Sequence, residues 1–165
     1  MMIPPIRPLE RILLHVDAAD ENATATRYAV ALAEACGAQL HAVYVVDEKL
    51  LGDLSRAKIF LDEEVGDLSR DLEEDGRKYL RAAERIARQH NVDLTGRLRR
   101  GIPHREVVDE AIHIKASIIV LGDIAIPLSV RDAFGNEFEM ILWTAPCPVL
   151  VVKGPAAEEL LRCYD

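Results

Sequence analysis

Residues 11–47 decide the fold, and they read RILLHVDAADENATATRYAVALAEACGAQLHAVYVVD. Residues 11–17 form a short apolar run rich in branched side chains, which is typical of a β-strand that is buried on both faces. Apolar residues then recur at helical spacing from Ala25 to Cys36, and the glycine that follows is a common residue at a helix end. A second apolar run covers residues 40–46. A strand, a helix and a strand joined at this spacing predict a parallel pair with a right-handed crossover.

The rest of the chain continues this alternation of strands and helices. The expected elements are a strand at residues 92–98, a helix opened by Gly101-Ile-Pro103, a strand at 117–122, a loop at 123–135, a helix at 136–144 and a strand at 149–152. In the helix after Pro103 the residues expected to be buried are Val107, Val108, Ala111 and Ile112. Together these patterns predict a Rossmann-like α/β fold, an open five-stranded parallel sheet with helices on both faces.

The length of the chain favours one domain. It has 165 residues, half of them hydrophobic, which is an ordinary composition for a single globular domain of this size. We expect one domain over residues 1–165, with its core at about 8–153, an insertion at about 48–75 and a C-terminal tail at 154–165.

The insertion leads into a long polar helix whose charges are sorted along the chain. Residues 62–75 contain eight acids and one base, whereas residues 77–88 contain five bases and one acid. This order matches the helix dipole. Its buried stripe is expected to consist of Leu68, Leu72, Tyr79, Ala83 and Ile86. Because a glycine inside a helix costs about 1 kcal/mol relative to alanine, we expect the helix to start after Gly76 or to bend there. Residues 49–61 are expected to form a loop or a short helix.

The charge of the chain excludes several classes of partner. Its net charge is −8, which repels nucleic acids and anionic membranes, and its apolar runs are far shorter than the roughly 18 residues that span a bilayer. We therefore expect a cytoplasmic protein that binds neither. The three cysteines are an odd number at wide spacings, and we expect reduced thiols, with Cys36 on the buried face of its helix.

No catalytic or metal-binding motif stands out, so the predicted site follows from the fold. In open α/β sheets, ligands bind beyond the carboxyl ends of the strands, which here lie at Asp17, residues 45–47, Gly101 and Gly122. After the fourth strand the spacing is Gly122, two residues, Ala125, nine residues and Gly135-Asn136, expected at a helix N-terminus.

Several stretches resemble the universal stress protein family. They are residues 11–17 with the helix that follows, His41-Ala-Val-Tyr-Val-Val-Asp47, Gly101-Ile-Pro103, Val120-Leu-Gly122 and Ala145-Pro-Cys-Pro-Val-Leu-Val-Val-Lys153. The resemblance covers about residues 8–153 and implies a cytosolic α/β domain, usually a homodimer, which binds ATP in one branch of the family and does not in another.

The resemblance also implies ligand-binding positions. Asp17 and Val45 would hold adenine and Gly122 would lie under the ribose of ATP or AMP, with no metal expected. The phosphate positions are Ala125, Gly135 and Asn136, and they depart from the family pattern. Ala125 replaces a glycine, Asn136 replaces a hydroxyl residue and Pro127 removes an N–H donor, so the phosphate cradle is depleted. His15 likewise replaces a proline that is usual in the first motif. Asp17 has an alternative role as the cap of the next helix.

Three functions remain open at this stage. The first is a non-catalytic stress-response homodimer that binds adenine nucleotide weakly or not at all, paired through the fifth strand at Val149, Leu150, Val151 and Val152. The second is a member of the same fold group that binds or cleaves ATP. The third is an interaction module that docks a protein partner through Glu48–Asp75, where apolar residues occur at Leu50, Leu51, Ile59, Phe60 and Leu61.

Overall fold

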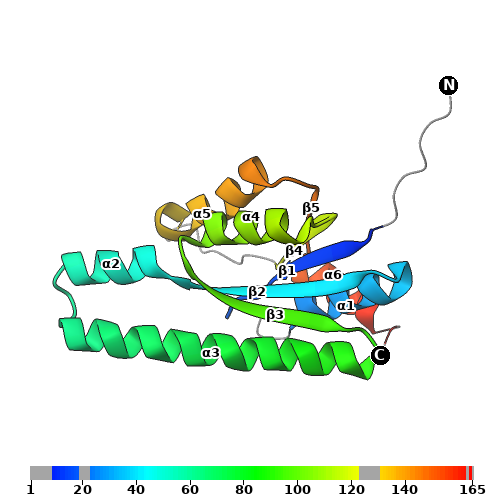
Figure 1. Cartoon of the computed structure of the whole chain (residues 1–165), viewed down its shortest axis with the longest axis horizontal. Helices are drawn as coiled ribbons and strands as arrows, with labels where there is room; N and C mark the ends of the chain where they lie inside the picture. Colours follow the sequence, from blue (N-terminus) through cyan, green and yellow to red (C-terminus); the bar gives the residue numbers. More distant parts are fainter. Residues whose placement is uncertain (1–8, 19–22, 123–130, 163, 165) are drawn as a thin grey trace.

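Within the residues that the structure describes, five parallel strands form one sheet in the order β3-β2-β1-β4-β5 (Figure 1). The computed structural model describes residues 9–18, 23–122, 131–162 and 164. The strands are β1 (Arg11–His15), β2 (Gln39–Asp47), β3 (Leu94–Gly101), β4 (Ile118–Leu121) and β5 (Val149–Val151). The helices are α1 (Thr24–Cys36), α2 (Glu48–Arg56), α3 (Asp62–Gln89), α4 (Pro103–Ile114), α5 (Arg131–Thr144) and α6 (Gly154–Leu161). The predicted α/β fold with an open five-stranded parallel sheet is confirmed.

Helices cover both faces of the sheet. Residues of α1, α3 and α6 pack in one apolar cluster, and residues of α4 and α5 pack in a second cluster on the opposite face. Along β1, Ile12 and Leu14 belong to the first cluster and Leu13 to the second, as the alternation of side chains along a strand requires. All three side chains are fully buried. The central strand therefore joins the two halves of the core.

The long polar helix is one continuous element, contrary to the expected start or bend at Gly76. The 28 residues of α3 run through Gly76, which is buried against β2. A Cβ atom at Gly76 would lie 2.3 Å from the Tyr44 ring and 3.0 Å from a methyl group of Leu98. Glycine stands here because it lets the helix backbone approach the sheet closely. Leu80 is buried on the same face, whereas Tyr79 is 36% exposed, so the predicted burial of Tyr79 is wrong.

Three other details of burial and helix placement differ from the sequence-based expectations. Cys36 is exposed at the end of α1, because the helix has turned its last residue away from the sheet. Ile112 is 58% exposed, and Glu110 occupies the buried face of α4 in its place. The expected C-terminal tail contains helix α6, which buries Ala157 and Leu161.

The expected insertion forms a helical hairpin. It consists of α2, the connection to α3 and the first half of α3, and α2 confirms the short helix expected within residues 49–61. Figure 1 shows both helices extending side by side beyond the ends of β2 and β3.

Gly76→Ala is expected to destabilise the protein, although alanine favours a helix by about 1 kcal/mol over glycine. The added Cβ would overlap the Tyr44 ring. We expect the free energy of unfolding, measured by urea denaturation, to fall by about 1–3 kcal/mol. Gly66 is the matched control in the same helix, because a Cβ there meets no atom within 4 Å. Gly66→Ala is expected to stabilise the protein by up to about 1 kcal/mol. Equal effects of the two substitutions would contradict the close packing of α3 on β2.

Candidate functional site

The topology of the sheet marks a candidate ligand site between the carboxyl ends of β1 and β4. These strands are neighbours, but α1, which follows β1, packs on one face of the sheet, and α5, which follows β4, packs on the other. In open α/β sheets, ligands bind where successive connections leave in opposite directions. The fold therefore marks this edge before any individual side chain is considered.

Three of the predicted site residues lie at this edge on three neighbouring strands. Val45 belongs to β2, Asp17 follows β1 by two residues and Gly122 directly follows β4. The Val16 N–H donates to the Val43 carbonyl oxygen at 2.9 Å, which extends the pairing of β1 with β2 toward Asp17. A Cβ at Gly122 would lie 3.6 Å from that of Ala25, so the first turn of α1 borders this position. The ligand-binding role of these residues stays a prediction.

Of the predicted phosphate-binding positions, those that the structure describes do not lie at the expected place. Ala125 and Pro127 lie outside the described residues. Gly135 and Asn136 are described, and they are the fifth and sixth residues of α5, which begins at Arg131. The expectation that they lie at a helix N-terminus is wrong. The helix tolerates Gly135 in its interior, at a cost of about 1 kcal/mol, and so starts a turn earlier than this glycine indicates.

This helix start changes which backbone groups face a ligand. The first four N–H groups of a helix have no partner within it, and Gly135 comes after four residues of α5 that the structure describes. The N–H groups of Gly135 and Asn136 instead fall within the hydrogen-bonded part of the helix. A phosphate at the end of α5 would therefore meet a different set of donors from the one that the sequence predicts.

Asp17 does not occupy the N-cap position of α1, the alternative role expected for it. The N-cap residue is Ala23, in a left-handed conformation with φ of 50°. Helix α1 starts at Thr24, seven residues beyond Asp17. Asp17 instead acts on the neighbouring His15, the last residue of β1. Burial lowers the pKa of His15, and the charge of Asp17 opposes that shift without reversing it. His15 is therefore a neutral, half-buried imidazole at neutral pH.

Another polar group near the carboxyl ends of the strands was not predicted from the sequence. Glu137 of α5 accepts a hydrogen bond from the backbone N–H of His104 at 2.9 Å and contacts Nδ1 of its ring at 2.6 Å. Lys49 of α2 lies 3.9 Å from the other carboxylate oxygen of Glu137. Glu137 thus ties α5 to the first turn of α4 and to the base of the hairpin. Its sequence context gave no signal, because its partners are remote in the chain.

Buried charges also link α4 to the edge strand β3. Glu110 is only 1% exposed, and Arg99 donates to its Oε2 at 2.7 Å. Arg97 lies 3.3 Å from the other oxygen, and Arg99 also donates to Glu106 at 2.6 Å. Each charge in this group has an opposite charge beside it, so removal of either arginine would leave the buried Glu110 carboxylate less well compensated.

The residues that the structure describes include neither a metal-binding cluster nor a membrane-spanning helix. Those residues contain no group of three or more His, Cys, Asp or Glu side chains placed to hold a metal ion. Within the same part of the chain, no helix combines the length and apolar character that a membrane crossing needs.

Comparisons with known proteins agree with one another. The sequence model of the universal stress protein family matches residues 8–153. The chain is 30% identical over 149 residues to the universal stress protein MJ0531 of Methanocaldococcus jannaschii, which covers 90% of this chain and 85% of that protein. Its structure resembles universal stress protein UspA from Lactobacillus plantarum, with a TM-score of 0.72 and 25% identity, over 90% of this chain and 100% of that one.

Two further solved structures share the fold and contain nucleotides. One is a universal stress protein in complex with cAMP, with a TM-score of 0.65 and 18% identity over 89% of this chain and 98% of that one. The other is the universal stress protein from Archaeoglobus fulgidus in complex with dAMP, with a TM-score of 0.60 and 20% identity over 87% of this chain and 98% of that one.

The lowered pKa of His15 predicts how stability depends on pH. The unfolded chain binds a proton at His15 near pH 6.5, whereas the folded protein resists it, so stability is lost as the pH falls below about 6.5. His15→Gln is expected to flatten the fall in the free energy of unfolding between pH 7 and pH 5, by up to about 1.4 kcal/mol per pH unit. Urea denaturation across this range measures the effect. The control is His113→Gln, on an exposed histidine of α4. An unchanged slope in His15→Gln would show that His15 is protonated as easily in the folded protein as in the unfolded chain.

Proposed function

The chain belongs to the universal stress protein family, and from that premise we propose that it is a non-catalytic, homodimeric stress-response protein of the cytoplasm. We further propose that it binds an adenine nucleotide weakly and chiefly through the adenosine part. One observation carries this proposal. At the carboxyl ends of the strands, the residues expected to bind adenosine match the family pattern, whereas those expected to bind the phosphates depart from it.

The adenosine half keeps the residues that the family pattern asks for. Asp17, Val45 and Gly122 come from three neighbouring strands and lie at one edge of the sheet. A carboxylate beside a largely buried valine offers a hydrogen-bond acceptor and an apolar surface, the combination that suits an adenine ring.

The phosphate half departs from the pattern. A triphosphate needs several convergent N–H donors at a glycine-rich turn and a helix N-terminus. Ala125 adds a Cβ, Pro127 lacks an N–H and Asn136 replaces a hydroxyl residue. Helix α5 also begins before Gly135. These differences weaken the interactions with a triphosphate more than those with a nucleoside or a nucleotide that carries one phosphate.

The nucleotides in related structures are consistent with this preference. The cAMP and dAMP of those two proteins each carry a single phosphate. A mononucleotide places fewer demands on the phosphate half than ATP does. We therefore propose AMP or a similar adenine mononucleotide as the ligand of this chain.

The proposed homodimer pairs the two copies through β5, and the two edges of the sheet differ in a way that supports this choice. The edge strand β3 carries Arg97, Arg99 and Arg100, and charges on an edge strand oppose pairing with another chain. The edge strand β5 is the apolar segment Val149–Val151. Val152 lies outside the proposed contact, because it is 4% exposed and donates its N–H to Leu121 of its own chain.

The end of α5 adds apolar surface close to β5 in the chain. Trp143 is 84% exposed and Leu142 is 45% exposed, only a few residues before β5 begins. Pairing of β5 with its own copy across a two-fold axis would protect the strand edge and bring this surface near the partner.

Nucleotide preference is testable by thermal shift. A ligand at 100 times its dissociation constant stabilises by about 2.7 kcal/mol, which corresponds to roughly 5–10 °C for a domain of this size. With millimolar ATP the natural protein is expected to show a much smaller shift, no larger than with AMP. Ala125→Gly combined with Pro127→Ser and Asn136→Ser is expected to bring the ATP shift to the full value, because it restores a flexible turn, an N–H donor and a hydroxyl.

Two controls separate the possible causes. Asp17→Ala in the triple variant is expected to abolish the shifts with both nucleotides, since it removes the adenine contact. Labelled ATP incubated with the natural protein is expected to stay intact. A full ATP shift in the natural protein, or hydrolysis of the label, would contradict the proposed function.

Val151→Lys is expected to convert the protein from a dimer to a monomer, as measured by light scattering. The substitution places a charge in the middle of the proposed strand pair. Thr95→Lys is the matched control, because it places the same charge at an exposed position on the other edge strand, β3. A mass that Val151→Lys leaves unchanged would overturn pairing through β5.

A further inference from the structure

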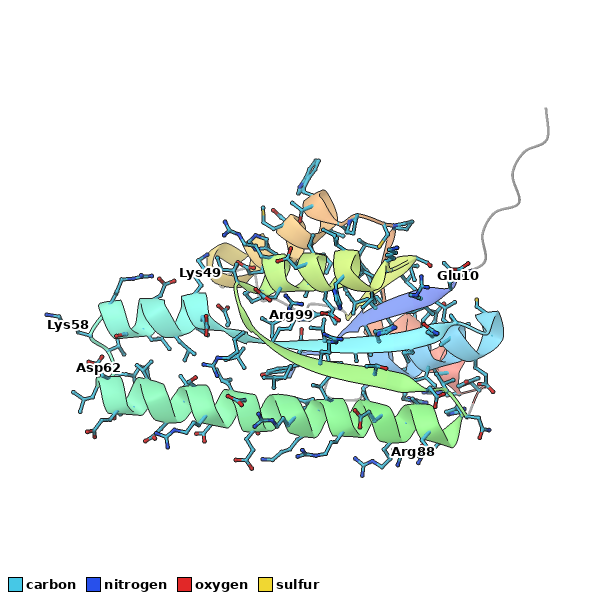
Figure 2. All side chains as sticks on the ribbon, viewed as in Figure 1. Glu10, Lys49, Lys58, Asp62, Arg88 and Arg99 are labelled. Atoms are coloured by element: carbon cyan, nitrogen blue, oxygen red, sulfur yellow. The ribbon has the colours of Figure 1, made fainter. Side chains whose placement is uncertain are left out.

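The connection between α2 and α3 exposes three consecutive apolar residues. Ile59 is 68% exposed, Phe60 41% and Leu61 72%, and we call these three residues the hairpin tip. Figure 2 labels Lys58 and Asp62 on either side of it, at the far end of the hairpin from the sheet. The structure separates these residues from Leu51 of α2, which is buried against the core. A run of three exposed apolar residues indicates a surface that another molecule covers.

The hairpin also concentrates the negative charge of the protein. Residues 48–75 contain ten carboxylates and four basic residues, so they carry a net charge of −6 of the −8 on the whole chain. Asp62, Glu63 and Glu64 follow the tip directly, and all three are exposed. The tip is therefore an apolar surface with an acidic border on its α3 side, whereas Lys58 precedes it on the α2 side.

The hairpin is held firmly at its base. Arg100 of β3 donates to Glu48 at 3.1 Å, to Glu73 at 2.8 Å and to Ser69 at 2.8 Å, so one guanidinium joins both helices to the sheet. Nearer the tip, Ser55 of α2 donates to Asp62 of α3 at 3.2 Å. A surface that is already ordered loses little conformational entropy when it binds.

We propose that the hairpin tip and its acidic border dock a basic amphipathic segment of a partner protein, with the apolar side chains of the segment on the tip and its lysines or arginines beside the carboxylates. Charge decides against the other occupants. Nucleic acids and anionic membranes carry the same sign as the hairpin. A second copy of the chain offers the same acidic hairpin, and the remainder of each copy has a net charge of only −2.

The test uses a defined probe on the full chain. The probe is a fluorescent 14-residue helical peptide of leucine and lysine with one apolar face, and its counterpart has glutamate in place of lysine. Fluorescence anisotropy is expected to show binding of the lysine peptide, weakened by added salt, and no binding of the glutamate peptide.

Combined Ile59→Ser, Phe60→Ser and Leu61→Ser is expected to weaken binding about tenfold or more. Glu63→Lys with Asp67→Lys is expected to weaken binding and to reduce its salt dependence.

The control variant is Ile112→Ser with Leu160→Ser, which changes two apolar residues that are 58% and 65% exposed on other helices. It is expected to bind like the natural protein. Arg100→Ala leaves the tip intact but loosens its base, and it is expected to weaken binding by a smaller factor than the serine variant. Circular dichroism checks that each variant is folded. If the triple serine variant does not fold, Phe60→Ser alone replaces it in the binding assay.

Three outcomes would overturn the proposal. Undiminished binding of the lysine peptide to the serine variant would show that the tip plays no part. Sedimentation of the protein with phosphatidylcholine–phosphatidylserine vesicles, lost in the serine variant, would assign the tip to membranes. A fall in native mass caused by the serine variant would assign it to a second copy. The assay contains no nucleotide, so its result is independent of the proposed nucleotide binding.

Discussion

The pairing of β1 with β2 on one side and with β4 on the other is the constraint on which the structure depends. Because Ile12, Leu13 and Leu14 have no exposed surface, helices must cover both faces of the sheet along this strand. The chain meets this requirement by sending the helix after β1 to one face and the helix after β4 to the other. The same divergence creates the edge where Asp17 and Gly122 lie. The place of the candidate site thus follows from the burial of the central strand.

Most of the fold is predictable from sequence because it rests on local periodicity. Branched apolar runs and helical spacing identify every strand and the helices between them. The sequence-based predictions fail where the placement of a residue depends on a contact with a residue far away in the chain. Gly76 looks like a helix breaker until Tyr44, some thirty residues earlier, requires a residue without a Cβ. Glu110 looks like a solvated carboxylate, yet it is buried beside Arg97 and Arg99 of β3, which neutralise it, whereas Ile112 of the same helix is exposed.

The candidate site is less predictable than the fold. The carboxyl ends of the strands can be predicted from the sequence. Because these ends share one edge of a parallel sheet, the placement of Asp17, Val45 and Gly122 at that edge can be predicted as well. The helical conformation of residues 131–135 is not predictable from sequence, because Gly135 and Asn136 are residues that favour both helix ends and turns. The contact of Glu137 with His104 joins α5 to the first turn of α4, and no pattern within either helix indicates it.

The candidate site and the hairpin meet at the end of β2, where Asp47 accepts a hydrogen bond from the Leu50 N–H at 2.9 Å and so starts α2. Such closeness does not make the two surfaces allosterically coupled, because coupling needs an element with two arrangements that both surfaces bias. Arg100 and Asp47 hold the base of the hairpin in one arrangement. The nine residues of α2 carry the tip about 13 Å from Asp47 at 1.5 Å per residue, which exceeds the screening length of about 8 Å at physiological salt. The acidic charge at the tip is therefore too distant to repel the phosphate of a nucleotide at the carboxyl edge. A rigid hairpin would allow one chain to carry both the proposed docking surface and the proposed nucleotide site without conflict between them.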